Sequence, residues 1–278
     1  GCMTVQSGAC VTDNPMASEV AGKSMTDMVV DDGKVFIAMS EHDLAAYDLE
    51  TFNELWVFET ERGLWAAPVI VDGVIYTAGM DHQLYAVDAQ YGQELWSKDL
   101  GGALASSPLY YDGDGNADDA RLYVGSFGRK VFELNMNGEV LAEYETENWV
   151  WSTPVLFDDI LYVTDLSGHV HALDTQNGLS LIWKVDTGEE GIRPSPLVTD
   201  QYVIVATQGG IIYWLDRATG TSQVQHDLEA EILSELLMVD VTVNEEVVTL
   251  LIVSTVKADK TLVAFTLDGG GQRWIYGR

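Results

Sequence analysis

The sequence predicts an all-β protein, a β-propeller of about six four-stranded blades. The first observation is a pattern that occurs six times: an apolar run, a turn, a second apolar run closing on Asp or Asn, then usually Gly and an aromatic residue. Its clearest copy runs from Ala67 through Asp88 to Gly92 and Trp96. A period of about 40 residues made of short strands is typical of propeller blades, which must stack on neighbours to bury both faces.

The second observation is that each part of the repeat keeps its register. A proline opens each of four successive blades, at Pro68, Pro108, Pro154 and Pro196, and the sixth repeat has Leu236 in its place. Proline is allowed there because the first residue of a strand need not donate a hydrogen bond to the neighbouring strand. A turn residue closes the second apolar run and precedes the last strand, at Asp48, Asp88, Asn135, Asp174, Asp216 and Asp268. Glycines suited to positive φ come next, at Gly92, Gly138, Gly178 and Gly220. The last strand carries Trp56, Trp96, Tyr144, Trp183 and Trp274, with 223–225 as a polar exception.

Repeats of Ser-x-Pro, Leu-Tyr-Ala-Val-Asp, Gly and Trp resemble the pyrroloquinoline-quinone-like (PQQ-like) propeller repeat. This family includes quinoprotein dehydrogenases and the outer-membrane assembly lipoprotein BamB, and the resemblance covers roughly residues 25 to 278. A BamB-like relationship implies a non-catalytic scaffold in the bacterial cell envelope. Such a scaffold presents loops and strand edges to a partner barrel and to other assembly factors.

Length and composition favour one repeat array over two domains. The chain has 278 residues, of which 47% are hydrophobic and 10% aromatic, enough for a large core. We expect residues 25–278 to form a single propeller and residues 1–24 to act as a tether or a closing strand. The last repeat either supplies its own outer strand or is completed by residues 5–11. Residues 247–253 are predicted to be a buried blade strand, and no apolar run is long enough to span a membrane.

The charge excludes some partners. Fourteen basic residues against 44 acidic ones give a net charge of −30, which repels phosphate backbones and anionic headgroups. Nucleic acid is therefore not an expected partner. The acidic surface is either a solubilising coat or a field that attracts basic partners or cations. We expect a monomer that binds proteins.

The two cysteines lie at the start of the chain. Gly1-Cys2 resembles the end of a bacterial lipobox, which would make Cys2 a lipidated residue and the protein an outer-membrane lipoprotein. The alternatives are a secreted protein whose Gly1 is a cloning remnant, or a disulfide between Cys2 and Cys10 in an oxidising envelope. On the first reading, the lipid anchor is the only membrane attachment.

An acidic insertion interrupts the third repeat. It resembles the calcium loop of integrin-type propellers, and its matching ligands are Asp112, Asp114, Asn116 and Asp118. Alternate oxygen-bearing side chains with glycines between them let a short loop converge on a hard cation. The sequence therefore predicts a structural calcium site, although no bidentate Glu follows at the twelfth position. The alternative is a solvated acidic turn.

The sequence offers little support for an enzymatic function. The quinoprotein dehydrogenases that this chain resembles are longer, and their vicinal cysteine pair has no counterpart here, so a quinone cofactor is not expected. The sequence also lacks a Gly-x-Ser-x-Gly elbow and a phosphate loop. We therefore expect no catalytic residues. A degenerate quinoprotein or ligand sensor remains as an alternative.

The histidines suggest turns or one metal site. His42 and His82 occupy the same turn in successive repeats. His169 and His171 are two apart on one strand, so they share a face and could ligate a transition metal, but no third ligand is visible nearby in sequence.

A binding face is the remaining functional hypothesis. Loops that enter the blades carry Trp65, Trp149, Trp151 and Arg193, and these residue types anchor interfaces through large buried area and planar hydrogen bonding. Alternatively, the aromatics cap the core between blades. An extracellular calcium-stabilised adhesion or polymer-binding module is a further alternative function.

Overall fold

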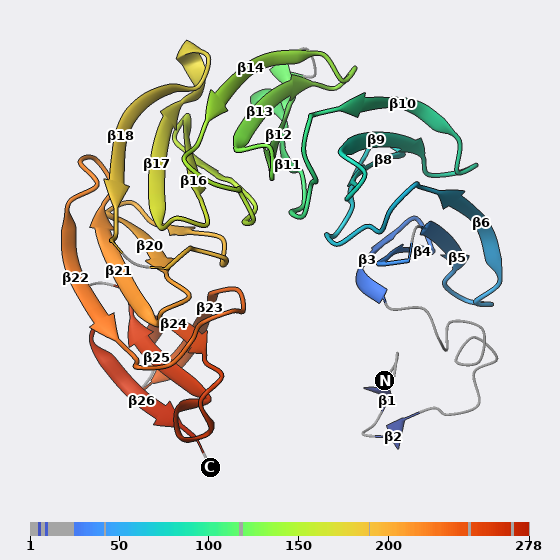
Figure 1. Cartoon of the computed structure of the whole chain (residues 1–278). Helices are drawn as coiled ribbons and strands as arrows, with labels where there is room; N and C mark the ends of the chain where they lie inside the picture. The colour runs from blue at the N-terminus through green and yellow to red at the C-terminus, as the bar shows by residue number, and fades with distance from the viewer. Residues whose placement is uncertain are drawn as a thin grey trace. The chain divides into compact units, whose positions relative to one another are not determined.

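The computed structural model describes residues 5–6, 9–10, 25–41, 43–116, 119–188, 190–243, 246–267 and 270–277. These residues form two compact units, one ending at Asp99 and the other beginning at Leu100. Each unit is built from four-stranded antiparallel sheets in which neighbours in sequence are neighbours in the sheet (Figure 1). We refer to each such sheet as a blade.

The first unit contains two blades and a short hairpin. Strands β1 (Val5–Gln6) and β2 (Ala9–Cys10) pair only with each other among the described residues. The first blade consists of β3 (Met25–Asp31), β4 (Lys34–Met39), β5 (Asp43–Asp48) and β6 (Glu54–Glu59). The second blade consists of β7 (Val69–Val71), β8 (Val74–Ala78), β9 (Gln83–Asp88) and β10 (Glu94–Asp99).

The second unit contains four blades. The third blade has β11 (Leu109–Tyr111), β12 (Arg121–Ser126), β13 (Lys130–Asn135) and β14 (Val140–Glu145). The fourth has β15 (Val155–Phe157), β16 (Ile160–Thr164), β17 (His169–Asp174) and β18 (Ser180–Asp186). The fifth has β19 (Leu197–Val198), β20 (Tyr202–Ala206), β21 (Ile211–Asp216) and β22 (Ser222–Asp227). The sixth has β23 (Leu237–Val243), β24 (Glu246–Ser254), β25 (Leu262–Thr266) and β26 (Gln272–Tyr276).

The turn chemistry predicted from the repeat is present in the described blades. The side chain of the turn residue accepts backbone N–H groups two or three residues on, as Asp88 Oδ1 does from Gln90 and Tyr91 at 2.9 and 2.7 Å. The glycine that follows has positive φ, 68° at Gly92 and 72° at Gly220. The turn residue Asp268 lies outside the described residues.

In the first and fourth blades, the tryptophan on the last strand is hydrogen-bonded to the following blade. Trp56 Nε1 donates to the carbonyl oxygen of Ala89 at 3.3 Å, and Trp183 Nε1 donates to that of Arg217 at 3.0 Å. A Cβ at Gly92 would lie 2.5 Å from the Trp56 ring, so glycine allows the two blades to approach. Apolar clusters between neighbouring blades then form the core of each unit.

The sixth blade supplies its own outer strand, β26, which pairs with β25. The prediction that residues 247–253 are buried is wrong in part, because Val247 is 69% exposed while Leu251 and Val253 are fully buried. The difference lies along the strand, since Val247, Leu251 and Val253 share one face of β24 and only its second half lies against the fifth blade. Leu251 and Val253 pack on the fifth blade, whereas Val248, Leu250 and Ile252 line an open apolar groove of about 770 Å³ that also includes Trp274.

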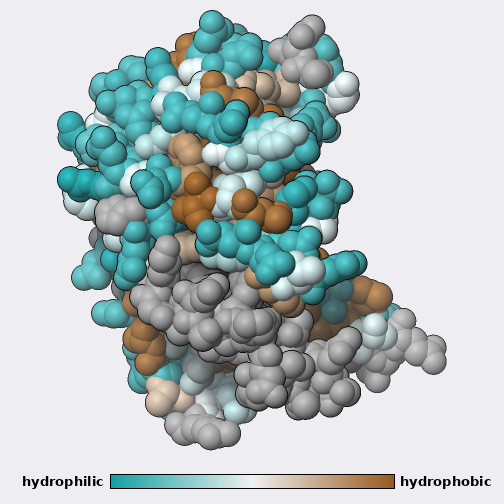
Figure 2. All heavy atoms as spheres, turned by 90° about the vertical axis from the view of Figure 1, so that its right-hand side faces the viewer, coloured by the Kyte–Doolittle hydropathy of each residue, from teal (hydrophilic) through white to brown (hydrophobic). Residues whose placement is uncertain are grey.

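The described chain contains no helix that is long and apolar enough to cross a membrane. Among the residues that the structure describes, three short 3-10 turns lie between strands: η1 (Gly113–Gly115), η3 (Thr175–Asn177) and η4 (Ala258–Lys260). Hydrophilic side chains predominate on the described surface visible in Figure 2, with apolar side chains in smaller patches. This distribution agrees with the strongly acidic composition.

Candidate functional site

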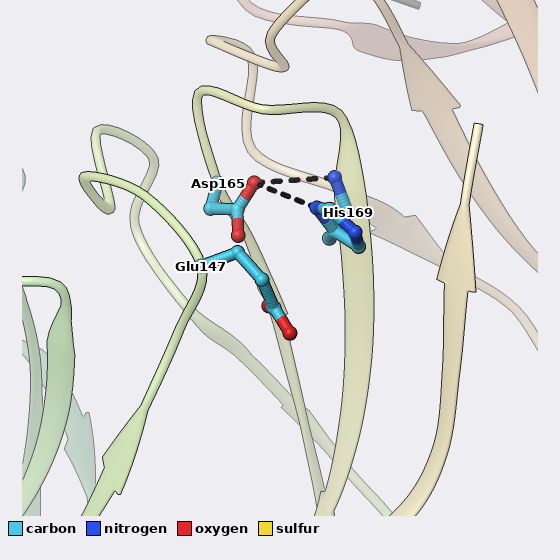
Figure 3. Close-up of side chains that lie close together, drawn as sticks. All are labelled: Glu147, Asp165 and His169. Carbon is cyan, nitrogen blue, oxygen red and sulfur yellow. Dashed lines mark hydrogen bonds and ion pairs between the residues drawn. The ribbon is translucent and has the colours of Figure 1, made fainter. Parts of the chain in front are cut away.

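Two carboxylates and two imidazoles meet where the third blade connects to the fourth. Glu147 lies in the loop between β14 and β15, Asp165 directly follows β16, and His169 and His171 lie on β17. Ligand atoms of Glu147, Asp165 and His169 all lie within 4.8 Å of one another. Figure 3 shows the three side chains grouped together, with Asp165 bonded to His169. We call the four residues the carboxylate–imidazole cluster.

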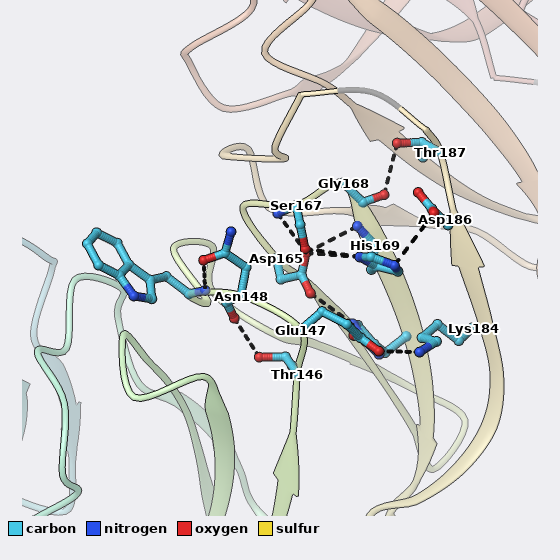
Figure 4. Close-up of polar contacts among 12 residues, drawn as sticks. Thr146, Glu147, Asn148, Asp165, Ser167, Gly168, His169, Lys184, Asp186 and Thr187 are labelled. Carbon is cyan, nitrogen blue, oxygen red and sulfur yellow. Dashed lines mark hydrogen bonds and ion pairs between the residues drawn. The ribbon is translucent and has the colours of Figure 1, made fainter.

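Asp165 is the fixed centre of this cluster. Its side chain is fully buried, and its Oδ1 accepts from the Ser167 amide at 2.9 Å, Ser167 Oγ at 2.8 Å and the His169 amide at 3.2 Å (Figure 4). Burial alone would raise the pKa of Asp165, but hydrogen bonds from His171, Ser167 and the His169 amide outweigh it and hold the pKa well below its ordinary value. Asp165 is therefore an ionised carboxylate inside the protein.

His171 connects the two carboxylates. Its side chain is fully buried, and its Nε2 lies 3.4 Å from both Asp165 Oδ2 and Glu147 Oε2. Its other ring nitrogen, Nδ1, is 3.2 Å from the hydroxyl of Tyr144, whose pKa is raised by burial and by the charge of Glu147. The imidazole therefore points one nitrogen at the carboxylates and the other at a neutral phenol.

The outer edge of the cluster is more exposed. Glu147 Oε1 is bonded to Lys184 Nζ, and the Glu147 side chain is 37% exposed. Burial would raise the pKa of Glu147, but Lys184 and the two histidines lower it overall, and the bond to Glu147 in turn raises the pKa of Lys184. His169 Nδ1 lies 3.1 Å from Ser167 Oγ and 3.5 Å from Asp165 Oδ1, while its Nε2 lies 3.8 Å from Asp186.

The sequence indicated the two histidines but missed their carboxylate partners. Glu147 is 22 residues before His169 and comes from the preceding blade's exit loop, so spacing along one strand could not find it. A comparison between repeats could have found part of the cluster. Gln83 and Tyr85 lie 86 residues before His169 and His171, and Gly79 lies 86 residues before Asp165, so the fourth blade departs from the second at these three positions.

A row of stacked aromatic side chains lies beside the cluster in sequence. Phe127 stacks on Trp149 with ring centroids 4.8 Å apart and on Trp151 at 5.4 Å. The guanidinium of Arg193 lies 4.8 Å from the centre of the Trp151 ring. Trp149 is 47% exposed, and Phe127, Trp151 and Arg193 are half-buried. The structure thus brings together three of the four predicted binding-face residues and adds Phe127, which the sequence analysis missed.

The loop that carries Glu147 also carries Trp149. Thr146 Oγ1 donates to the Asn148 carbonyl oxygen at 2.6 Å, and the Trp149 amide donates to Asn148 Oδ1 at 2.8 Å (Figure 4). The next residue, Val150, is fully buried in the core between the third and fourth blades. The aromatic row and the carboxylate–imidazole cluster are therefore anchored on one short, internally bonded loop.

The other predicted site residues lie apart from this loop. Trp65 belongs to the first unit and is 46% exposed. In the acidic insertion, Asp112 is exposed and the amide of Asn116 donates to Asp119, while Asp118 and the side chain of Asp114 lie outside the described residues. The calcium site stays a prediction. Cys2 and His42 also lie outside the described residues, whereas His82 is in the predicted turn, with φ of 77°.

The sequence of this chain is similar to those of known proteins. The family model described as outer membrane protein assembly factor BamB matches residues 40–118 and 167–278, which is more than half of the chain. The chain belongs to this PQQ-like propeller family. A BamB from Kangiella koreensis is 29% identical over 105 residues, which are 34% of this chain and 27% of the relative. The match thus spans about a quarter of the curated relative's length.

Solved structures confirm the predicted fold class. BamB from Moraxella catarrhalis has a TM-score of 0.70 at 19% identity, with 90% of this chain and 75% of that chain covered. The computationally designed Ika8 protein has a TM-score of 0.66 at 14% identity, covering 92% and 88%. The WD40 β-propeller domain of Doa1 has a TM-score of 0.66 at 15% identity, covering 92% and 83%. Six four-stranded antiparallel blades and these likenesses show a β-propeller.

Proposed function

We propose that this chain is a non-catalytic binding scaffold of the bacterial cell envelope, similar to BamB, that contacts a protein partner in outer-membrane assembly. The observation that carries the proposal is the stacked row of Trp149, Phe127, Trp151 and Arg193. Family membership supports an assembly role, and the row supplies the residue types that dominate the energetics of protein interfaces.

The geometry of the row suits a binding role. Stacking fixes the orientation of the rings before a partner arrives, so little side-chain entropy is lost on binding. The exposed indole of Trp149 offers a flat apolar surface at one end, and the cationic Arg193 offers donors at the other. A partner segment with an aromatic or apolar anchor next to a carboxylate or a backbone carbonyl would match both ends.

Site-specific photocrosslinking in the native cells tests the proposal. A photoreactive residue at position 149 should capture an outer-membrane β-barrel assembly protein. A residue at Leu181, which is 46% exposed on the outer strand β18, serves as the matched control and should capture it at least about tenfold less. Capture of surface polymer alone, or equal capture from both positions, would contradict the assembly role.

The same cells test the proposed envelope location. We propose that Cys2 carries the lipid anchor, because Gly1-Cys2 matches the last two residues of a lipobox, whose cysteine is the acylated residue. Mass spectrometry of the N-terminal peptide should find an acylated Cys2 in the membrane fraction. An unmodified Cys2 in secreted protein would refute the anchor without affecting the crosslinking result.

A further inference from the structure

We infer that the carboxylate–imidazole cluster binds a divalent transition metal of the zinc class, with Glu147, Asp165, His169 and His171 as ligands. The inference is independent of the proposed assembly role. It begins with the donor set, since two imidazole nitrogens and two carboxylate oxygens are ligands that Zn²⁺ accepts, whereas Ca²⁺ and Mg²⁺ prefer oxygen alone.

The spacing of the donors fits one small ion. Ligands about 2.0–2.2 Å from a tetrahedral zinc ion lie roughly 3.4 Å from one another. His171 Nε2 is 3.4 Å from an oxygen of each carboxylate, and ligand atoms of Glu147, Asp165 and His169 lie within 4.8 Å of one another. The two imidazole centroids are 6.0 Å apart, a separation that lets both rings face the same ion. Rotation of the His169 side chain toward His171 and Asp165 Oδ2 would bring the four donors to tetrahedral spacing.

The surrounding groups are arranged as they are around metal ligands. A ligating imidazole usually donates its second N–H to an oxygen, and Tyr144 provides that oxygen 3.2 Å from His171 Nδ1. Ser167 and the His169 amide hold the Oδ1 side of Asp165, which fixes the direction of the carboxylate. The other oxygen of Asp165, Oδ2, then faces His171 and the space between the side chains of the cluster.

The local charge also favours a cation. Asp165 and Glu147 place two carboxylates at the cluster, and Lys184 contributes one neighbouring ammonium on Glu147 Oε1. Glu147 still directs Oε2 toward His171, so it can serve Lys184 and an ion at the same time. Buried carboxylates are costly unless they are paired or coordinate a metal. A bound ion would also brace the loop that carries Trp149.

The second blade indicates which substitutions can remove the proposed ligands without disturbing the repeat. Replacing His169 and His171 with their counterparts in that blade, His169→Gln and His171→Tyr, removes both nitrogens while using residues that the repeat already accommodates. Untagged, chelator-treated full-length protein would be titrated with ZnCl₂ by calorimetry and with CoCl₂ by absorption spectroscopy. Circular dichroism would verify that each variant is folded.

We expect one zinc ion per chain and cobalt absorption bands typical of tetrahedral nitrogen and oxygen coordination. The double variant should bind zinc more than about 100-fold more weakly than the wild type. Tyr144→Phe, which removes only the hydrogen-bond partner of His171, should weaken zinc binding by roughly 10–100-fold. Asp81→Asn in the second blade should leave zinc binding unchanged. The inference is overturned if the wild-type chain does not bind zinc stoichiometrically, or if the folded double variant binds it equally well.

Discussion

In the second blade Asp81 Oδ2 accepts from the Tyr85 hydroxyl at 2.8 Å and from the Glu61 amide at 3.1 Å, whereas in the fourth blade Asp165 and Glu147 share the imidazole of His171. Tyr85 and His171 occupy equivalent positions 86 residues apart, as do Glu61 and Glu147. One backbone frame therefore holds two different polar centres.

The two centres differ in how their donors respond to protons and metals. Burial, followed by the hydrogen bond to Asp81, raises the pKa of Tyr85, so this phenol stays neutral and only donates. An imidazole can donate, accept a proton or ligate a metal. The repeat thus places an aromatic ring at the position of Tyr85 and His171 in both blades. Histidine instead of tyrosine at this position in the fourth blade adds a group that can bind a proton or a metal, within the same fold.

The largest effect should follow removal of the buried carboxylate. Asp165→Ala should lower the free energy of unfolding by about 3–5 kcal/mol, because it leaves His171 and the Ser167 amide without their acceptor inside the protein. Asp81→Ala should cost about 1–3 kcal/mol, since Asp81 is only partly buried. Urea unfolding at pH 7 measures both changes, and equal losses would remove the distinction between the blades.

A second comparison concerns the donor at the aromatic position. His171→Leu should cost about 3 kcal/mol, because Asp165 and Glu147 lose the donor between them. His171→Tyr should cost only about 1–2 kcal/mol, since a hydroxyl can take the role that Tyr85 has and only the added volume must be accommodated. Thermal unfolding of the two variants in chelator tests this order, and a tyrosine variant as unstable as the leucine variant would contradict it.

The acid dependence of stability should distinguish Asp165 from its replacement by asparagine. The pKa of Asp165 is lowered in the folded chain, so its charged form stabilises the fold at pH values above the unfolded pKa of about 4. That contribution declines as the pH falls from about 5 toward the lower folded pKa. The stability difference between wild type and Asp165→Asn should therefore shrink by about 1 kcal/mol between pH 7 and pH 3 and continue to shrink below pH 3. A difference that is constant with pH would show that Asp165 contributes by shape alone.

The smallest effect should come from the exposed ion pair. Lys184→Met should change the free energy of unfolding less than any of the variants above, because Lys184 and Glu147 are each more than one third exposed. Lys98, which lies 86 residues earlier on β10, is the matched control. Raising the salt concentration should reduce the Lys184 effect further. An effect as large as that of His171→Leu would mean that this lysine belongs to the buried network.

The repeat, its six copies and the turns between them could all be predicted from the amino-acid sequence. These features are local: Asp88 caps its own turn, Gly92 adopts positive φ there, and Trp56 recurs as Trp183 on the same edge of its blade. Local hydrogen bonds and backbone sterics act between residues a few positions apart, so they leave a periodic trace in the sequence.

The contacts between side chains of different blades could not be predicted from the sequence, because they depend on the folded arrangement of the blades. Glu147 reaches Asp165 and His171 because the exit loop of the third blade lies against the inner hairpin of the fourth, and Phe127 enters the aromatic row from the third blade. Likewise, burial along residues 247–253 depends on which part of β24 the fifth blade covers. Contacts between blades depend on how the sheets stack. Stacking involves residues that are far apart in the sequence, so the pattern within one repeat does not predict these contacts.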